Sequence, residues 1–167
     1  MEAFIGFCSC AESIFRSLYE KSPANFIASN ELALALLAMD GRKKHQQATQ
    51  YAQVHSGRHK DLRTVVGRQA AATLAYGLHK LGRTAAAERV IQQVITSGEV
   101  SPQIGYFAAV IFRNCGRRDV AKQLLQKSLS SYIAFPEQES ARQLLKDILV
   151  ATTTEGVESR SANPQPE

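Results

Sequence analysis

Residues 106–129, YFAAVIFRNCGRRDVAKQLLQKSL, decide the fold, because they contain two helical segments separated by Gly116. Small residues set the spacing: Ala109 lies seven residues before this glycine, and Ala121 lies five residues after it. Larger apolar side chains recur at helical spacing within the two segments: Phe112, Leu125 and Leu129. The stretch therefore predicts a pair of helices joined by a short turn at Gly116.

The same frame recurs 34 residues upstream. The equivalent positions carry Ala75, Leu78, Gly82, Ala87, Ile91 and Ile95. A period of this length, built from a helix, a turn and a second helix, is typical of stacked helical pairs. On these residues the chain resembles the tetratricopeptide-repeat (TPR) family. We therefore predict an all-α fold: a right-handed α-solenoid of stacked antiparallel helix pairs, with about three and a half TPR-like repeats and a C-terminal capping helix.

The rest of the chain follows this frame less closely. We expect a half-repeat, three repeats and a capping helix at 1–22, about 23–57, 62–100, 101–134 and 135–150. Together they would form one helical domain over residues 1–150. Residues 151–167 lack periodic apolar side chains and are rich in Thr, Ser, Glu and Pro, so we predict a disordered tail there.

Local signals predict where several helices begin and end. Ser22–Pro23 and Ser101–Pro102 each offer a capping serine followed by a proline suited to the first helical position. Thr84 is a further predicted N-cap. Gly41 should follow the end of a helix, and Ala48 lies seven residues beyond it, so we expect the turn at Gly41 to hold about two extra residues.

Composition limits the classes of function. The chain has 167 residues, 44% of them hydrophobic, which suits one domain. Its net charge of +5 indicates no more than a moderate preference for anionic partners. The densest basic region spans residues 42–68, and no aromatic side chains alternate with its charges as a single-strand stacking surface requires. We interpret this region as a solvated rim and expect nucleic-acid binding to be the less favoured function.

Cysteine and histidine do not form a recognisable site. Cys8, Cys10 and Cys115 are too few for a disulfide framework, so a reducing compartment is expected. No second cysteine pair accompanies Cys8 and Cys10, and we predict no metal and no cofactor. The four histidines are expected to face solvent, and Cys115 to be a small buried apolar residue.

The N-terminal segment lacks the basic residues of a signal peptide, and no apolar run approaches the length that spans a bilayer. We expect a cytoplasmic protein, or a periplasmic one if the chain is a fragment of an exported parent. Phe4, Ile5 and Phe7 make an apolar start that is unlike the polar cap of a solenoid. The chain is therefore expected to be part of a longer array, to start late at Met1, or to associate with another copy through this half-repeat.

The resemblance also implies a site. In TPR proteins the first helices of successive pairs line a concave groove that receives a peptide or a helix. The groove positions map onto two sets of residues in this chain: Gln69, Tyr76, His79 and Lys80, and Gln103, Tyr106, Arg113 and Asn114. The chaperone-binding subclass holds acidic tails with Lys and Asn at fixed positions, two of which carry Ala72 and Tyr76 here, so that mode is not expected.

No phosphate-binding loop, paired carboxylate or nucleophile motif points to an enzyme. The order of features is similar to that of the C-terminal portion of long bacterial TPR proteins, many of which serve envelope or polysaccharide-export systems. We predict a non-enzymatic protein–protein interaction scaffold. The alternatives are a basic helical-repeat module that binds nucleic acid and a self-associating fragment of a longer TPR protein.

Overall fold

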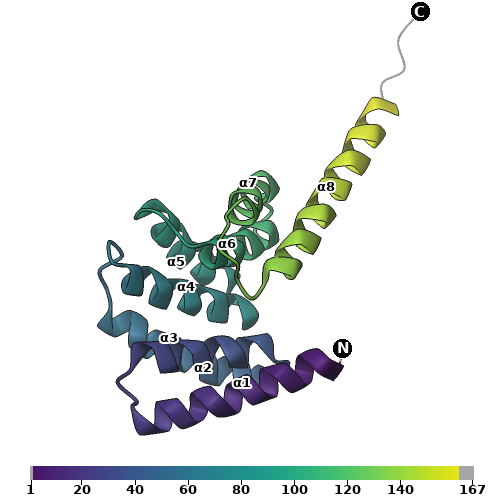
Figure 1. Ribbon diagram of the computed structural model, residues 1–167. Coiled ribbons are helices and arrows are strands. Elements are labelled where there is room, and N and C mark those ends of the chain that lie inside the picture. Colours follow the sequence, from purple (N-terminus) through teal and green to yellow (C-terminus); the bar gives the residue numbers. More distant parts are fainter. Residues whose placement is uncertain (1, 162–167) are drawn as a thin grey trace, which may run out of the picture. The chain divides into compact units, whose positions relative to one another are not determined.

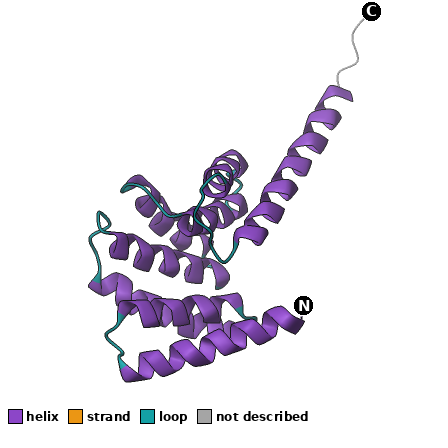
Figure 2. Cartoon of the chain, viewed as in Figure 1, coloured by secondary structure: helices purple, strands orange, loops and turns teal. Residues whose placement is uncertain are grey.

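The computed structural model describes the backbone of residues 2–161 and the side chains of residues 10–151. This part of the chain forms eight α-helices and no strand (Figures 1 and 2). The helices are α1 (Glu2–Lys21), α2 (Phe26–Ala38), α3 (Arg42–Arg58), α4 (Val65–Lys80), α5 (Thr84–Thr96), α6 (Pro102–Asn114), α7 (Arg118–Leu129) and α8 (Gln138–Ser161). The prediction of an all-α fold is confirmed.

The chain divides into two compact units, Met1–Val100 and Ser101–Glu167. Within the first unit each of the helices α1 to α5 packs on the next, and α2 also contacts α4. Within the second unit α6 packs on α7, α7 packs on α8, and α6 also contacts α8. Packing between consecutive helices is consistent with a helical repeat. One continuous domain over residues 1–150 stays a prediction.

The two glycine turns of the predicted repeat have the same backbone geometry. Gly82 and Gly116 both have a φ of 78°, a left-handed conformation that glycine adopts readily. After each glycine the next amide, of Arg83 or Arg117, donates to the carbonyl five residues earlier, at 2.9 and 2.8 Å. This bond closes a helix by pairing one of its last carbonyls. The predicted turns at Gly82 and Gly116 are confirmed.

Alanines occupy the interior of both hairpins. Ala75 and Ala87 are fully buried in the α4–α5 pair, and so are Ala109 and Ala121 in the α6–α7 pair. A small side chain lets two helix axes approach closely while larger residues fill the grooves beside it. The alanine positions read from the sequence therefore lie where the helices of each pair are packed.

Of the three predicted N-caps, two are wrong and one is right. Helix α2 begins after Asn25, whose side chain accepts a hydrogen bond from the amide of Ala28 at 3.2 Å, rather than at Ser22–Pro23. The chain makes a turn first, because the Asn25 amide donates to the Ser22 carbonyl. Thr84 is the first residue of α5 and not its cap, because Arg83 occupies the N-cap position with no side-chain bond.

Ser101 is the N-cap of α6 as predicted. Its side chain accepts a hydrogen bond from the amide of Ile104 at 3.4 Å, and Pro102 is the first residue of the helix. The missing amide hydrogen of proline is no loss in the first turn, where no carbonyl lies in position to receive it. Serine followed by proline therefore predicts the start of α6 but not that of α2.

The extra residues near Gly41 lengthen a helix and not a turn. Residues 39–41 connect α2 to α3, and residues 81–83 connect α4 to α5, so the two connections have equal length. Gly41 has a φ of 123° and lies immediately before α3, which runs for 17 residues against 13 for α5. The prediction of a longer turn is wrong, because α3 starts directly after the glycine.

The capping helix differs from its predicted bounds at both ends. Helix α8 starts at Gln138 and continues to Ser161, 11 residues beyond the predicted end at residue 150. Residues 151–161 contain no proline, and the hydrogen bonds that prolong a helix lie within the helix itself, so the helix can continue through them. Ala141 and Ile148 hold α8 against its unit. Residues 162–167 of the predicted tail lie outside the described residues.

Candidate binding sites

The eight predicted groove residues lie on the first helices of two pairs. Gln69, Tyr76, His79 and Lys80 are on α4, in the first unit, and Gln103, Tyr106, Arg113 and Asn114 are on α6, in the second unit. The predicted placement of the two sets side by side stays a prediction.

The α4 set is mostly withdrawn from solvent. The Tyr76 ring is only 9% exposed, stacks on His79 at 6.4 Å between centroids, and lies 5.6 Å from the Lys80 ammonium nitrogen. Burial, followed by the charge of Lys80, lowers the pKa of His79. Helix α4 packs against α2, α3 and α5, which leaves few of its positions exposed. The exposed end of this set is Lys80, and the buried Tyr76 ring offers little surface to a partner.

The capping segment contacts the groove side of α6. The Gln103 side-chain amide donates to both carboxylate oxygens of Glu137, at 3.2 and 3.0 Å. The Tyr106 ring is 8% exposed and lies 6.4 Å from the ring of Phe135. Two of the predicted groove residues therefore bind the chain's own C-terminal segment.

A hollow of about 370 Å³ lies between α6 and α8. We call it the α6–α8 hollow, and its lining residues are Tyr106, Val110, Arg113, Asn114, Ser140, Gln143, Leu144 and Asp147. Arg113 and Asn114 are exposed, and on the opposite wall the Gln143 side-chain amide donates to the Asp147 carboxylate at 2.8 Å. The hollow combines a cation, an anion and amide groups with apolar contact from Val110 and Leu144.

A second cavity, of about 340 Å³, was not predicted. We call it the α1–α3 cavity, and its lining residues are Tyr19, Pro23, Ala24, Ser29, Tyr51, Val54, His55 and Arg58. Ser29 and His55 are buried, with exposed fractions of 0% and 3%. No described protein atom makes a hydrogen bond to the Ser29 Oγ or to the His55 Nδ1.

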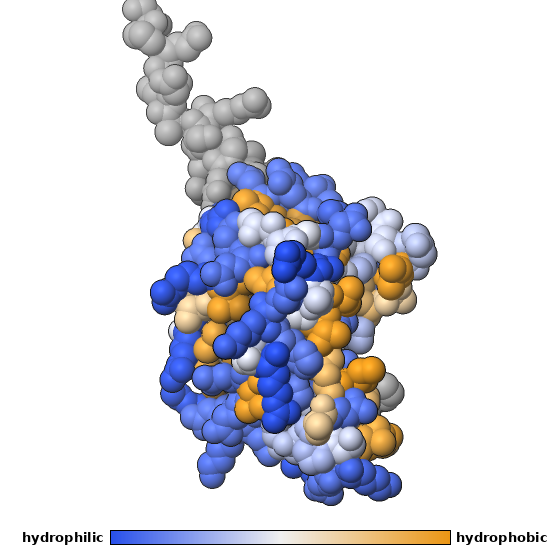
Figure 3. All heavy atoms as spheres, turned by 90° about the vertical axis from the view of Figure 1, so that its left-hand side faces the viewer, coloured by the Kyte–Doolittle hydropathy of each residue, from blue (hydrophilic) through white to orange (hydrophobic). Residues whose placement is uncertain are grey.

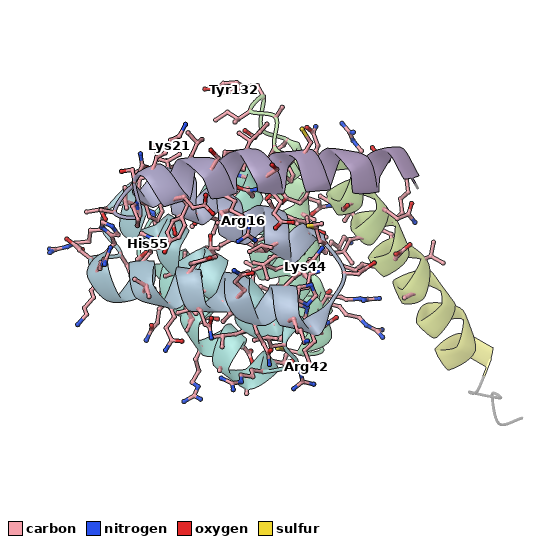
Figure 4. All side chains as sticks on the ribbon, turned by 90° about the horizontal axis from the view of Figure 1, so that it is seen from below. Arg16, Lys21, Arg42, Lys44, His55 and Tyr132 are labelled. Carbon is pink, nitrogen blue, oxygen red and sulfur yellow. The ribbon has the colours of Figure 1, made fainter. Side chains whose placement is uncertain are left out.

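The ring of His55 is held by aromatic neighbours. It makes an edge contact with Phe26 at 5.6 Å between centroids and stacks on His59 at 6.2 Å. Burial, then the charges of Arg58 and His59, lower the pKa of His55, which favours the neutral ring. In the view of Figure 4, His55 lies on the side of α3 toward α1, away from the end of α3 that carries Arg42 and Lys44.

The prediction that all four histidines face solvent is wrong for His55. Its spacing of four residues from Tyr51, on a helix that otherwise looks polar, is the signal that the sequence contained. Burial itself depends on α1 and on Phe26, which come from outside α3.

Basic residues are concentrated in the part of the sequence that contains α3 and α4. Residues 42–83 contain nine Lys and Arg residues and one acidic residue, Asp61, and all four histidines. Asp61 is paired with Arg63 at 3.1 Å, and this hydrogen-bonded pair lowers the pKa of Asp61. The two helices α3 and α4 therefore carry most of the net positive charge of the chain.

The described residues contain no group of three or more His, Cys, Asp or Glu side chains placed to hold a metal ion. Cys115 is half-buried rather than fully buried, and Cys10 is exposed. Within the same residues no helix combines the length and apolar character that crossing a bilayer requires.

Helix α1 exposes large apolar side chains. Ile14 and Leu18 are 54% and 46% exposed, whereas Phe4, Ile5 and Phe7 lie outside the described side chains. On the face of the molecule in Figure 3, apolar groups are interspersed with polar ones rather than joined in one band.

Models of known families, curated protein sequences and solved structures were compared with the chain, and none of them matches.

Proposed function

We propose that this chain is a non-enzymatic protein-interaction module of the TPR type, with the right-handed superhelical stacking of that family, which binds a peptide segment on the groove side of a first helix. The proposal is supported by the 34-residue period and by the matching turns at Gly82 and Gly116. Handedness and family type are part of the proposal.

The α6–α8 hollow is the observation that carries the peptide-binding role. Three of the residues that the TPR resemblance assigns to the groove, Tyr106, Arg113 and Asn114, line this hollow together with Val110. Its volume of about 370 Å³ lies within the range of sites that take small ligands or peptide side chains. A groove that the repeat frame places on α6 therefore coincides with a hollow that the packing of α8 leaves open.

The walls suit an extended peptide that carries a charged side chain. Arg113 can pair with a carboxylate of the peptide, and Asp147 on the opposite wall can pair with a basic group. Asn114 and Gln143 supply amide groups for the peptide backbone. We expect modest affinity, because the partner must be ordered on a small and polar site.

The test is a selection of random peptides on the immobilised chain, followed by binding measurements on the selected peptides. Arg113→Ala and Asn114→Ala together should weaken binding by about tenfold or more, the loss expected for two buried polar contacts. Lys127→Ala, an exposed charge removed from α7, is the matched control and should leave binding unchanged. Equal affinity for the double variant and the control would exclude this hollow as the site.

Nucleic acid is the second candidate partner, favoured by the nine basic residues and one acidic residue in residues 42–83. Binding of this kind depends on phosphate contacts, so its strength should fall steeply as salt is added. A titration with generic DNA and RNA at low and moderate salt measures this. If neither binds at low salt, the nucleic-acid role is excluded.

A further inference from the structure

The α3–α4 pair has basic side chains at both ends, and the packing of the two helices brings five of them together. Residues 59–64 join the end of α3 to the start of α4. Near the other end of α4, Gly77 lies so close to α3 that a Cβ there would be 2.6 Å from the hydroxyl of Thr49, in the first half of α3. The helices are therefore antiparallel, and α3 starts where α4 ends. We call this the basic end, and its basic residues are Arg42, Lys43, Lys44, Lys80 and Arg83.

The cations of the basic end are not neutralised by the chain itself. None of the five makes an ion pair with a residue that the structure describes. The Lys44 ammonium contacts the Met39 sulfur at 3.5 Å, and the Lys80 ammonium lies 5.6 Å from the centre of the Tyr76 ring. All of them except Lys44 are exposed. Asp40 is the one acidic residue in the two segments, 39–44 and 79–83, that form this end.

The basic residues at the opposite end of the pair are partly used within the chain. Arg63 pairs with Asp61 at 3.1 Å. The Arg68 guanidinium donates to two backbone carbonyls of the connection between α3 and α4, at 3.0 and 2.9 Å. Arg58 and Lys60 are the other two basic residues there. The basic end therefore differs from the opposite end in keeping its charges available to a partner.

The start of α3 carries positive charge where it is unfavourable for a helix. Its first turn contains Arg42, Lys43 and Lys44 and no acidic residue, and Figure 4 shows Arg42 and Lys44 at the same end of the helix. The helix dipole gives this end a positive partial charge, so basic side chains there oppose it. A partner that brings negative charge to the basic end would offset both this effect and the mutual repulsion of the five cations.

The surroundings of the basic end favour the phosphates of a duplex over other anions. An aromatic surface for unpaired bases is lacking, because the Tyr76 ring is only 9% exposed. None of the large apolar side chains that the described residues expose lies in the two segments of this end, so no apolar anchor for a membrane surface accompanies the charges. A duplex presents closely spaced phosphates on a stiff backbone, which suits cations held at the ends of packed helices.

We propose that the basic end of the α3–α4 pair binds double-stranded nucleic acid through its phosphates, independently of base sequence. The inference rests on the nucleic-acid role given above as the second candidate, and it gives that role a surface and a type of strand. The guanidinium groups of Arg42 and Arg83 suit bidentate pairing with phosphate oxygens, while Lys43 and Lys80 attract phosphate as point charges. Both turns contribute to the surface, so both are needed for full affinity.

Fluorescence anisotropy with a labelled duplex of about 20 base pairs, titrated at several salt concentrations from about 50 mM upward, measures the affinity and its dependence on salt. Two double variants are tested: Arg42→Gln with Lys43→Gln, and Lys80→Gln with Arg83→Gln. Each should weaken binding by about tenfold and reduce the salt slope by about two, one for each lost phosphate contact. Lys44 is left unchanged because it is half-buried.

The matched control is Arg58→Gln with Lys60→Gln, which removes the same charge from two exposed side chains at the opposite end. Its affinity should fall by less than about threefold, since exposed charges beyond a Debye length are largely screened. Equal losses at the two ends would mean that net charge alone attracts the duplex, and the proposal would be overturned. A loss from only one of the two turns would contradict a surface built from both. The melting temperature of each variant verifies that it is folded.

Other ligands test the type of partner. Two duplexes of unrelated sequence should bind equally, and a single strand of the same length should bind more weakly than either. Binding to vesicles that contain phosphatidylserine, without binding to the duplex, would assign the basic end to an anionic membrane and overturn the proposal.

The outcomes also separate this inference from the proposals on which it depends. If no nucleic acid binds at low salt, the nucleic-acid role and this inference both fail. If the duplex binds the chain and the two basic-end variants equally well, the nucleic-acid role stands and this inference alone fails. The peptide-selection experiment on Arg113 and Asn114 does not depend on either result, since those residues lie in the other unit.

Discussion

The α2–α3 and α4–α5 pairs have connections of equal length and alanines at their interior, but they use that interior differently. In α4–α5 the buried groups of the second helix are Ala87, Ile91 and Val94, all apolar. In α2–α3 the second helix buries Thr49 and His55 beside its alanines. The regular pair is closed by packing, whereas the irregular pair keeps polar atoms inside.

We relate the apolar interior of α4–α5 to the stability of the fold, whereas the buried polar groups of α2–α3 depend on their hydrogen-bond partners. A hairpin that follows the repeat frame needs only small and large apolar side chains in the right order. Ser29, Asn30 and His55 are polar, and each requires a hydrogen-bond partner once it is buried. Asn30 obtains one, because the Thr73 hydroxyl donates to its side-chain oxygen at 2.8 Å. Ser29 and the Nδ1 of His55 have none in the described part of the protein.

The largest expected effect is in the regular pair. Ala87→Leu places a large side chain where α4 and α5 are packed and should lower the free energy of unfolding by about 1–3 kcal/mol. Ala85→Leu, on an exposed position of the same helix, should change it by less than about 0.5 kcal/mol. Urea denaturation measures both. Equal losses would mean that the alanine positions do not mark the packed surface.

Substitution should distinguish a buried polar side chain that has a hydrogen-bond partner from one that has none, by their effects on the free energy of unfolding. Thr73→Val removes the hydrogen bond to Asn30 and leaves that amide buried, at a cost of about 1.5 kcal/mol in unfolding free energy. Ser29→Ala removes a buried hydroxyl that has no protein partner, so the unfolding free energy should stay unchanged or rise by up to about 1–3 kcal/mol. A loss for Ser29→Ala as large as that for Thr73→Val would show that Ser29 has a structural partner.

Substitution of a turn glycine should lower the free energy of unfolding by less than a large side chain in the packed interior does. Gly82→Ala forces a left-handed conformation on a residue with a side chain and should cost about 1 kcal/mol, although no atom obstructs the new methyl group. Gly57→Ala is the matched control within helix α3, again with open space around the methyl group, and should stabilise the protein by about 0.5 kcal/mol. Thermal denaturation of both variants measures the difference. If both substitutions changed the stability in the same direction, the left-handed conformation of Gly82 would be contradicted.

The smallest expected effect is a change in how the melting temperature depends on pH. Burial lowers the pKa of His55 and of His79, so the unfolded chain takes up these protons before the folded chain does. The associated stability is complete above the unfolded pKa of about 6.5 and is lost as the pH falls below it toward the lowered folded values. The melting temperature should therefore drop between about pH 7.5 and about pH 5.5, and by less in His55→Gln. An unchanged pH dependence in this variant would show that His55 is not buried as described.

The period of the sequence predicted the parts of the fold that depend on local geometry. The turns at Gly82 and Gly116 and the alanines beside them need only a glycine and small residues at fixed separation. Other features depend on contacts between distant segments. Gly77 of α4 lies so close to α3 that a Cβ there would be 2.6 Å from the Thr49 hydroxyl, and nothing in the spacing around Gly77 indicates this approach.

The candidate sites were predictable to different degrees. Three groove residues that the TPR resemblance implied on α6, Tyr106, Arg113 and Asn114, line one hollow, but the opposite wall comes from α8, whose bounds the apolar pattern did not give. The α1–α3 cavity was not predicted, because the burial of Ser29 and His55 results from the packing of three helices and not from either local sequence.

Photo-crosslinking shows whether the groove side of α6 holds a peptide. A photoreactive amino acid is placed at position 110, which lines the α6–α8 hollow, or at position 127, which is exposed on α7, and each protein is irradiated with a selected peptide. We expect crosslinks from position 110, lost on competition with unlabelled peptide, and none from position 127. Crosslinks from position 127 and not from position 110 would contradict this expectation.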